Sequence, residues 1–213
     1  MAKLYFKFGA MGSSKTAQAL MTKFNYEEKD QTVWLIKPST DNRDDKIGED
    51  GKIKTILRSR IGLNAEAEAI APDIDIYKEF LSRSKNGNYT DVIICDECQF
   101  LTSKQVTQLK EIVNKLDVPV LCFGLSTDFQ TRLFPGSARL FEIADSITEI
   151  KSICKCGRKA TVNARFDATG RIIIKGEQVF IGGNDSYIGM CYKCYMNLIE
   201  ETYGEEAKEI FFY

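Results

Sequence analysis

Apolar positions in the first part of the chain fall into two alternating kinds of segment. Short apolar runs that end at polar residues or proline predict β-strands at residues 4–8, 32–37, 91–95 and 118–123. Apolar or small residues spaced three and four apart predict α-helices at 15–24, 74–84 and 103–116, and the polar stretch 39–52 predicts a loop. Strands that alternate with helices are typical of a mostly parallel sheet with helices on both faces. We therefore predict an α/β fold that binds its ligands at the carboxyl ends of the strands.

The pattern changes near residue 150. Beyond it, short alternating segments carry glycine at positions 157, 170, 176, 182, 183 and 189 and lie between two close pairs of cysteines. Helical spacing returns at residues 195–207. We expect two domains, a larger one at residues 1–149 and a small β-rich one at residues 150–213 that folds around a metal ion.

Composition is that of an ordinary globular protein. The chain has 213 residues, 44% hydrophobic and 28% charged, so it can bury a substantial core. Its 29 basic and 30 acidic side chains leave a net charge of −1, so we expect no nucleic-acid partner. No apolar stretch approaches the roughly 18 residues of a membrane span, and the first residues do not read as a signal peptide. We therefore expect a cytoplasmic protein with no membrane partner.

The chain has no histidine. A Ser-His-Asp triad and a His-ligated zinc site are therefore excluded, and a general base must be a carboxylate or a rarer group. Seven cysteines without an export signal indicate a reducing compartment, in which thiols stay free or bind metal. Cys95, Cys98 and Cys122 lie on or beside predicted strands, where we expect them to be small buried hydrophobic side chains.

A phosphate-binding loop is predicted directly after the first strand. The P-loop pattern is Gly, four residues, Gly, Lys and Ser or Thr, because backbone N–H groups must surround phosphate oxygens where a helix begins. The expected nucleotide-binding residues are Gly9, Ala10, Met11, Gly12, Ser13, Ser14, Lys15 and Thr16. Lys15 would reach the β- and γ-phosphates of ATP and Thr16 would bind Mg²⁺. Ser14 replaces the second glycine, and a positive φ there would cost about 1 to 2 kcal/mol.

An acidic pair ends the third predicted strand of this P-loop NTPase-type sheet. Asp96 and Glu97 follow the apolar run that begins at Val92, and a carboxylate at such a position organises Mg²⁺ in P-loop enzymes. Asp96 is the predicted metal-organising residue. Glu97 is the leading candidate for general base, a role usually worth about 10² to 10⁴ in rate. Water as acceptor would make an ATPase and an alcohol a kinase, while the simpler alternative is that these residues only cap the next helix.

Four cysteines near the end of the chain have the spacing of a metal site. They are Cys154, Cys156, Cys191 and Cys194. Four thiolates suit a closed tetrahedral Zn²⁺ site that leaves no position for chemistry, so we predict structural zinc. The single residue inside the first pair is fewer than usual. A disulfide and unrelated free cysteines are the alternatives.

With these parts in place, the chain resembles the type II thymidine kinases, which join a P-loop α/β domain to a zinc-bearing lasso domain. The resemblance covers residues 5–195. Besides the phosphate loop, it is carried by Asp41-Asn42-Arg43, Asp96-Glu97-Cys98-Gln99-Phe100, Phe123-Gly124-Leu125, Asp128-Phe129-Gln130, Cys156-Gly157-Arg158-Lys159-Ala160 and Ile181-Gly182-Gly183-Asn184-Asp185-Ser186-Tyr187. A generic NTPase would share only the phosphate loop and the second of these motifs.

The resemblance implies transfer of the γ-phosphoryl group of ATP to the 5′-hydroxyl of thymidine, with Mg²⁺, Glu97 as catalytic base and Gln99 among the nucleotide-binding residues. The substrate-binding residues that it implies are Met11 and Leu125 at the thymine methyl, Phe100, Phe129 and Phe134 in the walls, Asp41 and Arg43 near the phosphates, and Asn163, Gly182 and Tyr187 in the lasso segment. It also implies a homotetramer and feedback inhibition by thymidine triphosphate.

Two other functions fit part of the sequence. The first is a nucleic-acid-stimulated ATPase, because Asp-Glu-x-Gln also occurs in helicases and zinc ribbons often bind nucleic acid; the near-neutral charge and the lack of a second motor domain argue against it. The second is a non-catalytic scaffold in which Ser14 has weakened the phosphate loop. For single residues, core packing of a phenylalanine and a solvated loop around Asp41 and Arg43 are the simpler interpretations.

Overall fold

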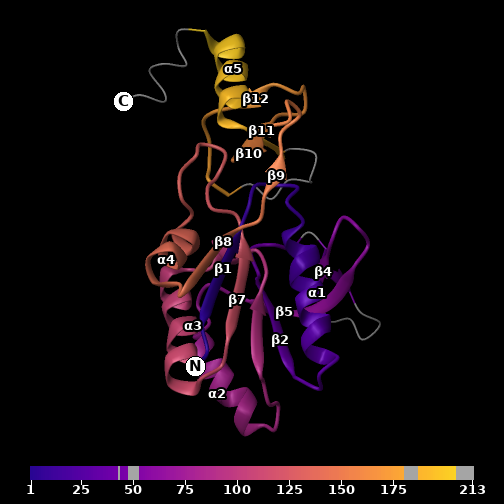
Figure 1. Cartoon of the computed structure of the whole chain (residues 1–213), viewed down its shortest axis with the longest axis vertical. Helices are drawn as coiled ribbons and strands as arrows, with labels where there is room; N and C mark the ends of the chain where they lie inside the picture. Colours follow the sequence, from indigo (N-terminus) through magenta and orange to yellow (C-terminus); the bar gives the residue numbers. More distant parts are fainter. Residues whose placement is uncertain (43, 48–52, 180–186, 205–213) are drawn as a thin grey trace.

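The computed structural model describes residues 1–42, 44–47, 53–179 and 187–204. Its centre is an eight-stranded sheet with the order β3-β4-β5-β2-β6-β7-β1-β8 (Figure 1). These strands are β1 (Leu4–Phe8), β2 (Val33–Pro38), β3 (Lys46–Ile47), β4 (Ile53–Arg58), β5 (Asn64–Ile70), β6 (Val92–Cys95), β7 (Val120–Gly124) and β8 (Ser146–Glu149). Every pairing from β5 to β8 is parallel, whereas β3, β4 and β5 pair antiparallel. The predicted α/β fold with a mostly parallel sheet is confirmed.

Helices cover both faces of this sheet. They are α1 (Lys15–Glu27) on one face and α2 (Ile76–Lys85), α3 (Ser103–Leu116) and α4 (Pro135–Ile143) on the other. Alternate residues of a strand point to opposite faces, so Trp34 and Ile36 of β2 pack on the side of α2 and α3 while Leu35 packs on the side of α1. Burial on both faces is why these strands are continuous apolar runs. None of the described helices is long and apolar enough to cross a bilayer.

The parallel strands bring four connections to one edge of the sheet. β2, β6, β7 and β1 are neighbours in that order, and the segment after each begins at the same carboxyl edge. The segment after β1 is the predicted phosphate loop, and the segment after β6 carries the predicted acidic pair together with a short 3₁₀ helix, η1 (Cys98–Phe100). The two candidate halves of the site therefore meet because of strand order.

The predicted strands and helices of the sheet domain are present, with ends shifted by at most three residues. The sequence analysis assigned no structure to residues 53–70, where β4 and β5 form an antiparallel hairpin, and none to α4 or β8. Predicting one continuous loop over residues 39–52 was wrong, because β3 lies within it. β3 has two exposed residues, too few for an alternating pattern to be visible. Residues 48–52 lie outside the described part of the chain.

The region after residue 150 extends beyond the carboxyl edge of the sheet, at the top of Figure 1. It contains a hairpin of β9 (Ser152–Ile153) and β10 (Lys159–Ala160), a sheet of β12 (Ile172–Ile173), β11 (Val162–Phe166) and β13 (Tyr187–Met190), and α5 (Tyr192–Tyr203). Its small apolar core includes Ala164, Tyr195 and Ile199. The predicted helix 195–207 is α5, which begins at Tyr192 and ends before Gly204; residues 205–207 lie outside the described residues.

Candidate active site

The phosphate loop lies between β1 and α1. The Nζ atom of Lys15 donates to the carbonyl oxygens of Gly9 and Ala10 at 2.9 and 3.0 Å, and it lies 3.3 Å from Oγ of Ser13. The ammonium group is thus held over the loop, beside the first turn of α1, where backbone N–H groups have no partner within the helix. Burial lowers the pKa of Lys15, and the neighbouring carboxylates of Glu97 and Asp96 oppose that shift.

Ser14 adopts a left-handed backbone conformation, with φ 62° and ψ 28°. It is the residue immediately before α1, and its side chain makes no capping hydrogen bond. A residue with a Cβ pays about 1 to 2 kcal/mol in this conformation, and glycine does not. The φ of Ser14 is positive, so the strain predicted for a positive φ at this position applies.

Asp96 and Glu97 follow directly on the carboxyl end of β6. Asp96 is 2% exposed. Burial and the charge of Glu97 together raise the pKa of Asp96 to about 7, and a hydrogen bond with the side chain of Thr16 opposes that shift. That bond joins the end of β6 to the first turn of α1. The two side chains expected to hold Mg²⁺ are thus in direct contact.

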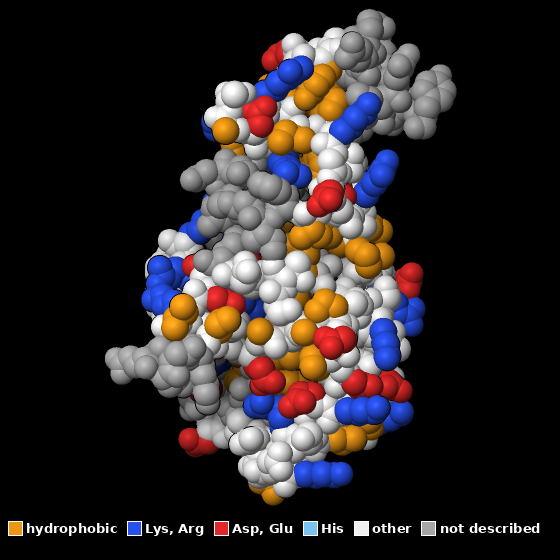
Figure 2. Space-filling view, turned by 180° about the vertical axis from the view of Figure 1, so that it is seen from behind, with side chains coloured by type: hydrophobic (Ala, Val, Ile, Leu, Met, Phe, Trp, Pro, Cys, Tyr) orange, Lys and Arg blue, Asp and Glu red, His pale blue; other side chains and the backbone are white. Residues whose placement is uncertain are grey.

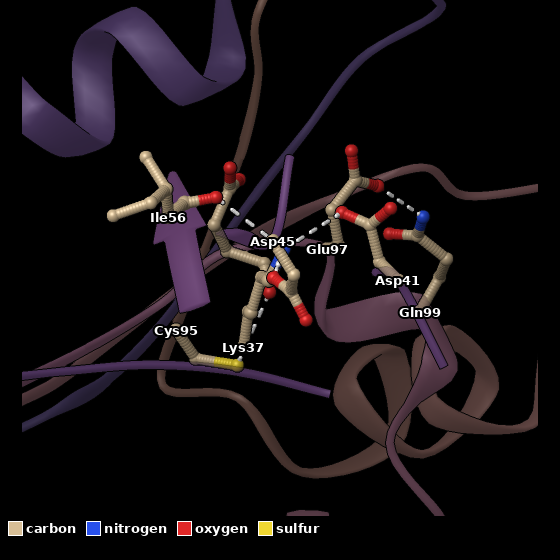
Figure 3. A network of polar contacts seen from close by, with 8 residues as sticks. Lys37, Asp41, Asp45, Ile56, Cys95, Glu97 and Gln99 are labelled. Atoms are coloured by element: carbon tan, nitrogen blue, oxygen red, sulfur yellow. Dashed lines mark hydrogen bonds and ion pairs between the residues drawn. The ribbon is translucent and has the colours of Figure 1, made fainter. Parts of the chain in front are cut away.

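Gln99 sets the position of Glu97. Its Nε2 donates to Oε2 of Glu97 at 2.5 Å (Figure 3). Its Oε1 accepts the backbone N–H of Leu125 at 3.0 Å. Gln99 is 1% exposed, so this amide bridges β6 and the segment after β7 in the interior. Glu97 also has a left-handed backbone, with φ 51°. Such strained residues gather at sites where the surrounding structure imposes the geometry.

A cavity of about 670 Å³ opens at the carboxyl edge of the sheet, which is within the range of small-molecule sites. Polar groups of the phosphate loop and apolar side chains from η1 and the segment after β7 line it together, and the rings of Phe100 and Phe134 pack edge to face at 5.7 Å. The predicted residues that line the cavity are Met11, Gly12, Ser14, Lys15, Thr16, Asp41, Glu97, Gln99, Phe100, Leu125, Phe129, Phe134, Asn163 and Tyr187.

Among the residues that the structure describes, four predicted members of this site are not on the cavity wall. Gly9, Ala10, Ser13 and Asp96 are buried behind it. Arg43 and Gly182 lie outside the described residues.

The four predicted zinc ligands converge. Their Sγ atoms all lie within 4.8 Å of one another, and those of Cys156 and Cys191 are 3.6 Å apart. A tetrahedral site with Zn–S bonds of about 2.3 Å places its sulfurs about 3.8 Å apart. All four are free thiols, and the backbone N–H of Cys194 already donates to the sulfur of Cys191 at 3.4 Å. This cluster fits a zinc-binding site.

Comparison with known proteins identifies the family. A family model described as thymidine kinase matches residues 2–195. The chain belongs to the thymidine kinase family. Among its relatives are thymidine kinases of Ruegeria pomeroyi, 44% identical over 91% of this chain and 93% of the relative, and of Shewanella oneidensis, 41% identical over 93% of this chain and 99% of the relative. A third relative, the thymidine kinase of Vibrio vulnificus, is 44% identical over 92% of this chain and 97% of the relative. The resemblance stated from the motifs is confirmed.

Several cavity residues of this thymidine kinase family member were missed by the sequence analysis. The end of β4 contributes Arg58 and the turn between β4 and β5 contributes Ser59, Arg60 and Ile61. The charge of Arg60 reaches Lys15, where it lowers the lysine pKa. Alternating alanine and glutamate at residues 64–70 is a strand signal that could have revealed the hairpin. That its turn reaches the phosphate loop follows only from the fold.

Asp128 is part of a motif that carries the family resemblance, but the sequence analysis gave it no role in the site. This carboxylate is 3% exposed. Its Oδ1 accepts the backbone N–H groups of Gln130 and Arg132 at 2.8 and 2.9 Å, and its Oδ2 accepts Nε2 of Gln178 at 3.0 Å. Gln178 belongs to the region after residue 150, so Asp128 fixes that region to the turn after β7.

Lys37 forms a buried charge network beside the cavity. It stands near the end of β2, is 2% exposed, and places Nζ 3.2 Å from Oδ1 of Asp45 and 3.7 Å from Oδ2 of Asp41 (Figure 3). The carbonyl oxygen of Ile56, on β4, lies 3.4 Å away. A buried ammonium group must be paired. Lys37 therefore holds the segment after β2, which carries Asp41, against the β4–β5 hairpin.

Proposed function

We propose that this protein is an ATP:thymidine 5′-phosphotransferase. One observation carries the proposal: the phosphate loop, the carboxylate Glu97 and an apolar wall that includes Leu125 and Phe129 all line one cavity. A triphosphate on the loop and a nucleoside against the apolar wall would meet beside Glu97. Membership of the thymidine kinase family supports thymidine and ATP as the substrates.

The proposed step is a direct phosphoryl transfer. The 5′-hydroxyl oxygen of thymidine forms a bond to the γ-phosphorus of ATP, the bond from that phosphorus to the bridging oxygen breaks, and ADP leaves. Glu97 accepts the hydroxyl proton and Lys15 supplies positive charge to the phosphate oxygens. Gln99, hydrogen-bonded to both Glu97 and the backbone of Leu125, holds the base against the acceptor side of the cavity.

Thr16 and Asp96 are the residues that would hold Mg²⁺. Their side chains are hydrogen-bonded to each other, and hydroxyl and carboxylate oxygens are ligands suited to this ion. When bound there, Mg²⁺ would supply positive charge that neutralises the phosphate groups of ATP. Because burial and the charge of Glu97 together raise the pKa of Asp96 to about 7, this group must be able to release a proton when the ion binds near neutral pH.

The apolar wall would receive the base of the nucleoside. Met11 and Leu125 would contact the thymine methyl, and the rings of Phe100, Phe129 and Phe134 would shape the pocket around it. Tyr187 lies on β13, beside this wall. A segment that closes over the nucleoside would exclude water, which is the competing acceptor in phosphoryl transfer.

Some further properties are proposed from the cysteine spacing and the sequence pattern, and two others, the homotetramer and the feedback inhibition, from the family resemblance. They are structural Zn²⁺ at the four cysteines, a homotetramer, feedback inhibition by thymidine triphosphate, a cytoplasmic location and a domain boundary between residues 149 and 150. The boundary is supported by β8, which ends at Glu149 in the large sheet, while β9 starts a separate one at Ser152. Met21 and Phe24 on α1 are 54% and 58% exposed, which supports a contact between subunits there.

The test is turnover with labelled thymidine and Mg·ATP. We expect thymidine monophosphate and ADP in equal amounts, and Glu97→Gln should bind ATP normally while turnover falls at least about a hundredfold. Glu66→Gln, on the exposed side of β5, is the matched control and should retain activity. Near-normal turnover in Glu97→Gln would remove this residue from the role of base.

The same assay separates the alternatives. Phosphate release that depends on nucleic acid would indicate an ATPase, and nucleotide binding without any turnover would indicate a scaffold. The surface argues against the first, because basic and acidic side chains are interspersed over the face seen in Figure 2.

A further inference from the structure

Asn163 joins three distant parts of the chain. It lies on β11, is 2% exposed, and accepts the backbone N–H of Met11 on its Oδ1 at 2.8 Å. Its Nδ2 donates to the carbonyl oxygen of Thr127 at 2.9 Å. One buried amide thus connects the phosphate loop, the turn after β7 and the region after residue 150.

Gly189 contacts the same loop residue from the neighbouring strand. It is paired with Asn163 in the register of β11 and β13. A Cβ atom on Gly189 would lie 2.5 Å from the carbonyl oxygen of Met11, closer than real Cβ contacts allow. Asn163 and Gly189, which are paired across β11 and β13, therefore contact the two polar backbone groups of Met11. Asn163 accepts its N–H, and Gly189 packs against its C=O.

The metal cluster packs against the adjoining loop residue. Ala10 is buried in one apolar cluster with Cys154, Ala160 and Cys191. The cysteines therefore support the strands that carry Asn163 and Gly189 and also touch the phosphate loop directly. This packing is a second observation, independent of the Asn163 hydrogen bonds, that residues after 150 contact the phosphate loop.

We propose that Asn163 is a positioning residue that sets the conformation of the phosphate loop from the region after residue 150. The inference rests on the proposed function, since it assigns the loop to a triphosphate. The hydrogen bond to Asn163 directs the N–H of Met11 away from the phosphate cradle and fixes where the cradle begins. The bond to Thr127 helps to orient Asn163, and the Oδ1 acceptor for the N–H of Met11 is the contact that acts on the loop.

This role differs from direct substrate recognition. Both polar groups of the Asn163 amide are engaged by backbone groups, although its side chain lines the cavity. Replacing the amide should therefore affect the ligand that depends on loop shape, which is the triphosphate. A residue that acts only through folding would lower the fraction of active protein and leave the KM for ATP unchanged.

The test combines hydrogen exchange with binding of inorganic triphosphate, and neither readout needs turnover. In Asn163→Leu we expect the peptide that contains Met11 to exchange at least about tenfold faster in the ligand-free protein, while peptides of β7 keep their protection. Triphosphate affinity should fall about tenfold, and the KM for ATP should rise by a similar factor. Asn197→Leu, on the exposed side of α5, is the matched control and should change neither.

Asn163→Asp keeps the acceptor for Met11 and removes the donor for Thr127. We expect it to retain most of the protection of the Met11 peptide, and it decides the question if Asn163→Leu does not fold. Unchanged exchange in Asn163→Leu, or protection lost equally in both variants, would overturn the proposal. If thymidine is not phosphorylated but these exchange results hold, the proposed function fails and the positioning role stands.

Discussion

The two regions of the molecule are stabilised in different ways. The sheet domain has a large apolar cluster on each face, with residues such as Leu4, Ile36 and Val120 fully buried. The region after residue 150 has a six-residue buried core and a second small cluster that contains Cys154 and Cys191 of the metal site. Apolar burial can stabilise the first region by itself, whereas the second depends on its four thiols and on contact with the first.

The difference bears on function because the region with the smaller apolar clusters contacts the phosphate loop of the larger one. The phosphate loop belongs to the sheet domain, yet Asn163 and the cluster around Ala10 hold it from the other side. Perturbing the metal site should therefore reach the nucleotide without unfolding the sheet. The predictions below test this contrast, beginning with the largest expected effect.

Removal of metal should unfold the region after residue 150 and leave the sheet domain folded. Structural zinc in small domains contributes an apparent binding free energy of about 10 to 16 kcal/mol, so chelation should unfold much of residues 150–204. We expect hydrogen exchange to become fast there and to stay slow in β1, β6 and β7. Zinc content should fall from one ion per chain in parallel, and added zinc should reverse both changes. Active protein that contains no zinc would contradict this account.

Lys37→Met should destabilise the sheet domain and leave the metal site intact. The substitution removes the buried ammonium group that pairs with the carboxylates of Asp41 and Asp45, and breaking a buried ion pair costs about 3 to 5 kcal/mol. The midpoint of urea unfolding should fall accordingly, with full zinc content. Lys54→Met, which removes a half-exposed lysine paired with Glu66, should change stability by less than about 0.5 kcal/mol. Equal effects of the two variants would contradict the buried network.

Asp96→Asn should change how the stability of the sheet domain depends on pH. The pKa of Asp96 rises from 3.8 to about 7 on folding, so the protonated group stabilises the fold at low pH and that contribution is lost as the pH rises through 7. Asparagine stays neutral, so we expect the ligand-free variant to be more stable than wild type above pH 7, by a margin that shrinks toward about pH 4. Urea unfolding of both proteins from about pH 4 to above pH 7 measures this difference in stability. Asp73→Asn, on an exposed turn, should show no such trend.

Ser14→Gly should give the smallest effect. Glycine relieves the left-handed strain of about 1 to 2 kcal/mol but loses more conformational entropy on folding, which leaves a net gain of about 0.5 to 1 kcal/mol. Asp30→Gly replaces another residue that has a positive φ, 58°, and lies away from the site. This variant should gain a similar amount of folding stability. Only Ser14→Gly should also alter the KM for ATP. A loss of stability in Ser14→Gly would show that the serine is not strained.

Much of the site was predictable because its parts are contiguous in sequence. The phosphate loop from Gly9 to Thr16 and the pair Asp96-Glu97 lie directly after apolar runs, and parallel strands bring such segments to one edge. Arg60 escaped prediction because a lone charged residue in a turn looks the same whether it faces solvent or a cavity. Asp128 belongs to a motif shared with the family, but the sequence does not show its contact with Gln178. For Lys37, nothing in the sequence distinguishes a buried ammonium from an exposed one.

By itself, the sequence determined the α/β fold, the family and the four cysteines that fit a zinc site, because double-sided burial makes continuous apolar strands and because short motifs fold locally. Only the tertiary structure decided which groups meet across those elements. The contacts of Asn163 with Met11 and Thr127, and of Gln99 with Glu97 and Leu125, depend on strand order and on how the two regions pack. Hydrogen bonds of this kind join ordinary polar residues that are far apart in the chain, so no local sequence pattern predicts them.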